Sequence, residues 1–157
     1  MSTARIQILD VQPQVDCGRY PAKATLGDEV PVSATIFRDG HDVLRAVVRH
    51  RPCGARAWRE LPLRPAGNDR WEATLVMEAL GRHEFCVHAW RDPYATWLDE
   101  HDRKVAAGQD DLAGELSEGE ALFGEGEVAD WRAAAPGLTL RNRRGAVTLP
   151  KPLELDV

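Results

Sequence analysis

The sequence has few cysteines, and their spacing excludes two classes of small domain. Only three are present in 157 residues, Cys17, Cys53 and Cys86, and no two of them form a C-x-x-C pair. A disulfide framework uses an even set of cysteines and a structural zinc site uses closely spaced ligands, so neither is expected. Free thiols are typical of a reducing compartment, and we predict a cytoplasmic protein.

Long apolar runs and broad basic regions are also missing. No apolar run approaches the ~20 residues that cross a membrane, and residues 1–5 lead directly into a strand pattern instead of the apolar part of a secretory signal. The net charge is -5, from 25 acidic and 20 basic residues. The short basic run at 141–144 lacks the interleaved aromatic residues that stack on bases. We therefore expect a soluble protein with no membrane partner and no nucleic-acid partner.

Catalytic motifs are absent as well. The sequence contains no G-x-S-x-G, no Gly-rich phosphate loop and no H-E-x-x-H. His83, Cys86 and His88 are an unsuitable metal site, because in a strand Cys86 and His88 share one face and His83 points to the other. Asp92 and Asp99 could form the carboxylate pair of a glycosidase, which needs ~5–10 Å between the groups, but small sandwiches seldom have an enclosing cleft. No catalytic residue, metal or cofactor is predicted.

What the sequence does contain is a series of short strands. Val30, Val32, Ala34 and Ile36 show the clearest period-two alternation, with serine and threonine between them. Similar patterns predict strands at 6–11, 23–26, 30–36, 44–49, 58–63, 71–75, 81–90 and 96–105. Gly, Pro and Asp turns separate them, and the connections are too short for parallel crossovers. The pattern predicts an antiparallel β-sandwich of immunoglobulin-like kind over residues 1–108.

The stretch from Gly81 to Trp97 ends the clearest part of this pattern. Its first half should contribute Phe85, Val87 and Ala89 to the core, and Asp92-Pro93 should then stop the strand, which resumes near Thr96. The bend is rich in aromatic and acidic residues.

Two interpretations of this bend remain open. Trp90, Tyr94 and Trp97, with Asp92, could stack on a sugar ring or anchor a partner, or they could close the end of the sandwich by packing. Arg19 and Tyr20, side by side in the turn-rich loop at 15–21, are further candidates for binding or an interface. That loop could equally be a plain crossing between sheets.

Residues 109–157 have a different composition. A helix is predicted over 110–123, and a second helical piece over 127–135 that Pro136-Gly137 should break. Leu138 and Leu140 could pair with Val147 and Leu149 in a hairpin. The last residues, 150–155, are typical of a linker or an extended segment.

Several short motifs together resemble one known family. They are DV at 10–11, VDCGRYPAK at 15–23, VSAT at 32–35, FRDGHD at 37–42, DRWEAT at 69–74, DPYATW at 92–97 and AGQD at 107–110. In order and spacing they are similar to the N-terminal region of alpha-1,4-glucan:maltose-1-phosphate maltosyltransferases, of the alpha-amylase superfamily.

The resemblance implies a sandwich followed by a helical domain and a catalytic (β/α)-barrel that transfers maltosyl units from maltose-1-phosphate to an α-1,4-glucan with retention. In that family the sandwich is associated with dimer contacts. This chain would then be a non-catalytic assembly domain that contacts a second copy and the barrel. The alternatives are a stand-alone α-1,4-glucan-binding sandwich that uses Trp90, Tyr94 and Trp97, and a general protein-interaction sandwich.

Overall fold

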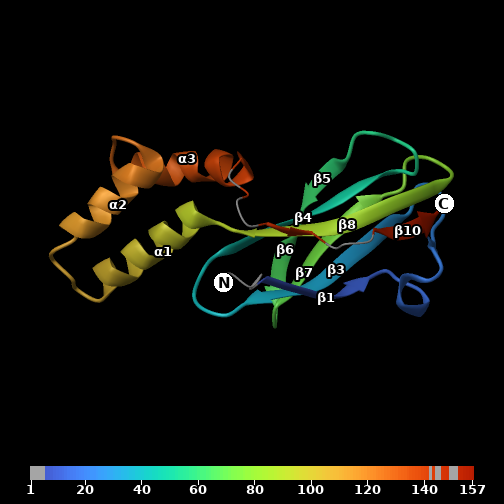
Figure 1. Cartoon of the computed structure of the whole chain (residues 1–157), viewed down its shortest axis with the longest axis horizontal. Coiled ribbons are helices and arrows are strands. Elements are labelled where there is room, and N and C mark those ends of the chain that lie inside the picture. Colours follow the sequence, from blue (N-terminus) through green and yellow to red (C-terminus); the bar gives the residue numbers. More distant parts are fainter. Residues whose placement is uncertain (1–5, 142, 144–145, 149–151) are drawn as a thin grey trace. The chain divides into compact units, whose positions relative to one another are not determined.

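A computed structural model of the chain describes residues 6–141, 143, 146–148 and 152–157 (Figure 1). Contacts divide it into a β-rich unit, composed of Met1–Asp39, Ala46–Trp90 and Ala146–Val157, and a helical unit, composed of Gly40–Arg45 and Arg91–Gly145. The β-rich unit is therefore discontinuous in sequence. No helix among the described residues is long and apolar enough to cross a membrane.

The first sheet of the β-rich unit has four antiparallel strands in the order β1-β3-β7-β6. Their bounds are β1 (Ile6–Gln12), β3 (Glu29–Arg38), β6 (Arg64–Gly67) and β7 (Arg70–Val76). The sheet forms because β3 and β7 present apolar residues on alternate positions of one face. Its buried indole, Trp71, donates a hydrogen bond from Nε1 to the carbonyl oxygen of Ile36 at 3.2 Å.

The second sheet has the order β2-β10-β8-β4-β5, with β9 also paired to β8. Its strands are β2 (Ala22–Lys23), β4 (Leu44–Pro52), β5 (Arg59–Pro62), β8 (Arg82–Arg91), β9 (Val147–Thr148) and β10 (Leu153–Asp156). β10 lies between β2 and β8, parallel to the first and antiparallel to the second. A strand from the end of the sequence thus lies inside the sheet, next to the edge strand β2.

The core of the β-rich unit lies between the two sheets. Alternate residues of β3 and β8, at most 1% exposed, face it: Val32, Ala34, Ile36, Phe85, Val87 and Ala89. Leu155 of β10 is equally buried, at 1% exposed. The predicted β-sandwich is confirmed, as is the expectation that the strand through Ala89 belongs to the core. The order β1-β3-β7-β6 matches the A-B-E-D sheet of immunoglobulin domains, but the immunoglobulin-like assignment stays a prediction.

The helical unit contains α1 (Pro93–Ala106), α2 (Ala113–Phe123) and α3 (Val128–Arg141). α1 begins with an Asp92 N-cap and a proline in its first turn, which are two strong helix-start signals. Its buried face, with Tyr94, Trp97 and Leu98, packs with Trp131 and Ala135 of α3.

Most of the helical unit lies, in sequence, between β8 and β9 of the second sheet. Ala89 of β8 and Val147 of β9 are partners in the antiparallel register. The chain therefore leaves the β-rich unit after Trp90 and returns to it at Ala146, beside the point of departure. The domain boundary predicted after residue 108 stays a prediction; residue 108 lies between α1 and α2.

Several predicted elements were wrong. The strand expected at 96–105 is α1, because the Asp92-Pro93 pair starts a helix where we expected a bend. Pro136 lies inside α3 and does not break it. The loop expected at 65–69, between the strands predicted at 58–63 and 71–75, begins with residues of a strand, β6 (Arg64–Gly67).

The expected C-terminal hairpin was also wrong. Leu138 lies in α3, while Val147 pairs with β8; Leu149 lies outside the described residues. The segment at 150–155, predicted as a linker or an extended segment, contains most of β10 in its described part and is extended there. The helix predicted over 110–123 is confirmed by α2.

Candidate functional site

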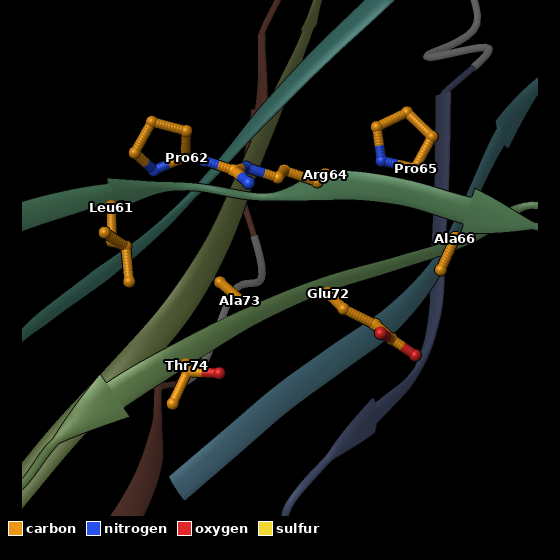
Figure 2. A pocket seen from close by; sticks show the side chains of 8 residues that line it. All are labelled: Leu61, Pro62, Arg64, Pro65, Ala66, Glu72, Ala73 and Thr74. Atoms are coloured by element: carbon orange, nitrogen blue, oxygen red, sulfur yellow. The ribbon is translucent and has the colours of Figure 1, made fainter. Parts of the chain in front are cut away.

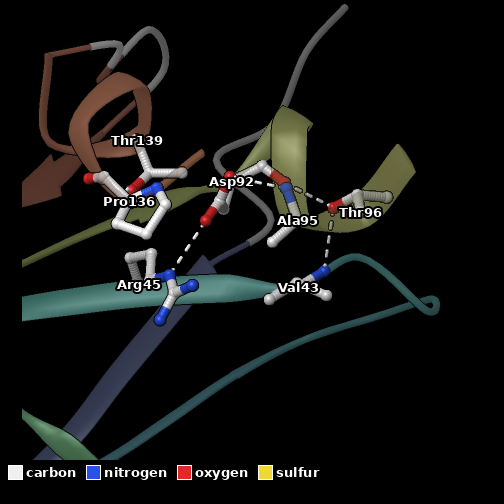
Figure 3. A network of polar contacts seen from close by, with 7 residues as sticks. All are labelled: Val43, Arg45, Asp92, Ala95, Thr96, Pro136 and Thr139. Atoms are coloured by element: carbon white, nitrogen blue, oxygen red, sulfur yellow. Dashed lines mark hydrogen bonds and ion pairs between the residues drawn. The ribbon is translucent and has the colours of Figure 1, made fainter. Parts of the chain in front are cut away.

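Asp92, the predicted candidate with the most polar contacts, is a fully buried carboxylate in the helical unit, at 0% exposed. Its Oδ1 accepts a hydrogen bond from the backbone N–H of Ala95 at 2.9 Å, which caps α1. Its Oδ2 accepts from Nε of Arg45 at 2.8 Å, and the Arg45 side chain is 50% exposed. Figure 3 shows both contacts converging on the carboxylate. One oxygen serves the helix and the other serves a segment 47 residues away in sequence.

The backbone of Asp92 is also fully used. Its N–H donates to the carbonyl oxygen of Val43 at 2.8 Å, and its own carbonyl accepts from the Thr96 hydroxyl at 2.6 Å. The same hydroxyl accepts from the N–H of Val43 at 3.0 Å. These bonds close a ring between the 40–45 segment and the first turn of α1 (Figure 3). A carboxylate with both oxygens engaged in a buried network is suited to holding structure, since a general base needs an oxygen that can reach a substrate proton.

Asp99, the other carboxylate considered for glycosidic chemistry, has a different role. It lies on α1, is 49% exposed, and pairs with Arg103 one turn later at 2.7 Å. Such a pair on a helix surface contributes a few tenths of a kcal/mol. Asp92 and Asp99 thus have separate structural partners.

Tyr94 and Trp97 are packed in the aromatic core of the helical unit. They are 9% and 5% exposed. The Trp97 ring lies 5.7 Å from Phe123 and 5.4 Å from Trp131, measured between ring centroids, and the Tyr94 ring lies 4.9 Å from Phe123. The Nε1 of Trp97 donates to the carbonyl of Glu115 at 3.0 Å. A sugar stacks on an exposed ring face, and these two rings are buried. They therefore serve the packing of the helical unit.

Trp90 belongs to the β-rich unit and is 1% exposed. All three aromatic residues considered as a sugar-binding platform are therefore buried. Arg19 and Tyr20 are different, because both are exposed. Tyr20 is 53% exposed, follows the short 3-10 helix Asp16–Gly18, and has the Arg19 guanidinium carbon 5.5 Å from its ring centroid.

The three residues considered as a metal site, His83, Cys86 and His88, do not converge on one point. A His83 ring nitrogen lies 2.9 Å from the carbonyl of Ala79, Cys86 is buried, and His88 is hydrogen-bonded to Thr148. Burial raises the pKa of the Cys86 thiol, which disfavours the nucleophilic thiolate. Across the described residues, no group of three or more His, Cys, Asp or Glu side chains is arranged to hold a metal ion.

Sequence reasoning missed an exposed apolar region at one end of the β-rich unit. Leu26, Val76 and Leu80 are 50%, 50% and 74% exposed, and we call them the turn-end residues. Their turns are tied together: Gly27 N–H donates to the carbonyl of Met77 at 2.8 Å. No periodic pattern in the sequence predicts their exposure, because each residue lies at or next to a turn. Single exposed apolar side chains are common on protein surfaces, so these three are interaction candidates only because the hydrogen bond joins their turns.

Comparison with known proteins gives one consistent family. Residues 4–152 match the family model described as alpha-1,4-glucan:maltose-1-phosphate maltosyltransferase, domain N/S. Curated maltosyltransferases of that name match from Myxococcus xanthus, 45% identical over 79% of this chain and 19% of the relative, and from Burkholderia pseudomallei, 45% identical over 75% of this chain and 10% of the relative. The Rhodospirillum rubrum relative is 36% identical over 97% of this chain and 25% of its own length. The chain thus spans a quarter or less of the curated relatives it matches.

Proposed function

The chain belongs to the alpha-1,4-glucan:maltose-1-phosphate maltosyltransferase family, and from this premise we propose that it is a non-catalytic, cytoplasmic assembly domain of such an enzyme. The match of residues 4–152 to the family's domain N/S carries the proposal. It relates nearly the whole chain to one named part of a longer transferase. The transfer of maltosyl units from maltose-1-phosphate to α-1,4-glucan would belong to the rest of that enzyme.

The use of the polar candidates supports a structural role. Both oxygens of the Asp92 carboxylate are hydrogen-bonded, one to the N–H of Ala95 as the N-cap of α1 and the other to Arg45. The helical unit is further held by Asp102, whose two oxygens accept from Nη2 of Arg132 at 2.8 and 3.0 Å. The Arg132 hydrogen bond lowers the pKa of Asp102, so this carboxylate stays ionised as a clamp between α1 and α3.

The proposed partners are a second copy of the chain and the catalytic barrel. For the second copy we favour the turn-end residues as the contact surface. Leu80 is the most exposed of the large apolar side chains among the described residues. Burying a fully exposed side chain of this kind is worth about 1.5–3 kcal/mol, and about half of that for Leu26 and Val76, which are already half-buried. That contribution favours association over a free monomer.

An activity assay tests the non-catalytic part of the proposal. The chain is incubated with maltose-1-phosphate and a maltooligosaccharide, and released phosphate is measured against the Myxococcus xanthus relative as positive control. We expect no phosphate release above background from the chain and clear release from the relative. Sustained release by the purified chain would contradict the proposal, because its own residues would then be performing the transfer.

A further inference from the structure

Among the described residues, a short edge of β7 in the first sheet has no strand partner. The N–H of Ile36 donates to the carbonyl of Asp69 at 2.9 Å, and the N–H of Met77 donates to the carbonyl of Asp28 at 3.0 Å. Because antiparallel hydrogen-bonded pairs alternate, these bonds show that odd-numbered residues of β7 direct their backbone groups toward β3. The even-numbered residues therefore direct their N–H and C=O groups to the opposite side.

On that opposite side β6 covers only half of β7. β6 pairs with Arg70 and Glu72 of β7, through Gly67 and Arg64. The chain before Arg64 already belongs to the second sheet, because Leu63 N–H donates to the carbonyl of Ala46 at 2.9 Å. In the described register the backbone groups of Thr74 thus face no strand. The Thr74 side chain makes no hydrogen bond to any other described residue.

The free Thr74 edge opens into a cleft. Leu61, Pro62 and Arg64 line one wall and Ala73 and Thr74 the other, and the volume is about 430 Å³. Figure 2 shows the strands close together near Pro65 and Ala66 and diverging toward Leu61 and Thr74. The gap widens because the chain passes at Leu63 from β5 in the second sheet to β6 in the first, so on this side only β6 lies beside β7.

The neighbouring strand edges are protected, and the Thr74 edge is not. The backbone groups of Leu63 point toward β4. Those of the preceding residue, Pro62, therefore point away from β4, and proline has no N–H to donate. Pro65 pairs with Trp71, an odd-numbered residue that faces β3, so Pro65 also faces away from β7. Prolines at such positions block the addition of another strand. The Thr74 backbone has both a donor and an acceptor, and no described strand pairs with them.

We propose that the Thr74 edge is a strand-addition site, which takes an extended segment of the parent enzyme from outside residues 1–157. The inference rests on the proposed function. The parent has ample chain for this, because the matched relatives extend far beyond the region they share with this chain, which spans 10–25% of their lengths. Backbone hydrogen bonds to an open edge supply affinity, and pockets for alternate side chains supply specificity.

The lining defines the chemistry of the segment. Leu61 and Ala73 are partly buried and apolar, so they favour small apolar residues on the inward side of the added strand. On the outward side Arg64 and Glu72 are register partners of opposite charge, which leaves no net charge to attract a charged segment. The occupant is therefore an alternating segment with apolar residues inward and uncharged polar residues outward.

Residue-level amide hydrogen exchange and peptide binding test this inference. The probes are overlapping peptides that cover the Myxococcus xanthus relative outside its matched 128 residues. In the free chain the Thr74 amide should exchange far faster than the Glu72 amide, which is paired with β6. One peptide, or a few that overlap, should bind and slow exchange at Thr74.

Two variants separate backbone pairing from side-chain contact. Thr74→Pro removes the donor and should weaken binding about tenfold or more, the value of one lost hydrogen bond plus steric exclusion. Thr74→Val keeps the donor and should bind like the unmodified chain. If Thr74→Pro fails to fold, the exchange measurement on the unmodified chain still decides.

Three results would overturn the inference. They are equal protection of the Thr74 and Glu72 amides in the free chain, no peptide that slows exchange at Thr74, and equal binding by the proline variant. Failure of the proposed function would instead appear as phosphate release by the chain or as a lack of self-association.

Discussion

Removing Arg45 should destabilise the helical unit more than removing its buried partner Asp92. The Arg45→Ala change leaves a carboxylate that is 0% exposed without its cation, and an uncompensated buried charge costs about 3 kcal/mol. Asp92→Ala instead removes the charge. It loses the N-cap, at about 1 kcal/mol, and a pair with a half-exposed arginine that water can replace, at up to about 1 kcal/mol. The expected loss is about 2 kcal/mol.

A double-mutant cycle in urea, followed by far-ultraviolet circular dichroism of the helices, measures these losses. In the double variant Arg45→Ala/Asp92→Ala no buried charge remains, so its free energy of unfolding should match that of Asp92→Ala alone. Asp92→Asn keeps the volume and an acceptor for the Ala95 N–H, and should cost less than Asp92→Ala. If Arg45→Ala cost less than Asp92→Ala, or if the two losses added in the double variant, the account of this carboxylate would be refuted.

The remaining predictions concern packing and pH. Gly119→Ala should destabilise α2 by about 1–3 kcal/mol, because the new Cβ would lie 2.5 Å from a ring carbon of Trp131; Gly114→Ala, with no atom within 4 Å of its Cβ, should stabilise by about 0.5–1 kcal/mol in the same thermal unfolding assay. Leu155→Ala should cost about 2–5 kcal/mol in urea unfolding, since β10 lies inside the second sheet; a loss under about 1 kcal/mol would argue against that placement. Burial, aided by the charge of Arg59, lowers the pKa of His50 below 6.5 in the folded chain. His50 therefore binds a proton more readily in the unfolded chain than in the folded one. Stability should fall as pH drops below about 6.5, and His50→Gln should show a smaller fall in melting temperature between pH 8 and pH 5.

The strands were predictable where local pattern and burial agree. Val32, Ala34 and Ile36 alternate with polar residues because one face of β3 lies on the core. β10 has a weaker local signal. Its residues follow prolines and form a strand because two distant strands, β2 and β8, supply its hydrogen bonds. Pairing of that kind depends on tertiary contacts that a local pattern does not record.

The error at α1 had a signal that could have corrected it. Asp92 followed by Pro93 fits an N-cap and first-turn proline as well as a bend, and Tyr94, Trp97 and Leu98 fall on one helical face. The partners of Asp92 had no such signal. Val43, in the connection between β3 and β4, and Arg45, near the start of β4, contact it across about fifty residues, and only the folded chain brings them together.

The assembly role is tested most directly by sedimentation equilibrium of the isolated chain. We expect a concentration-dependent mass that approaches twice that of one chain, and Leu80→Asp should remain monomeric, since a charge at the contact is costly to bury. Leu9→Asp is the matched control. Leu9 is 50% exposed, against 74% for Leu80, and it pairs with Thr35, six residues along β3 from the Glu29–Val76 pair, or about 20 Å from the turn end. This control should still dimerise. A chain that is monomeric at every concentration would contradict the central claim, and dimerisation of Leu80→Asp would contradict the surface assigned to it.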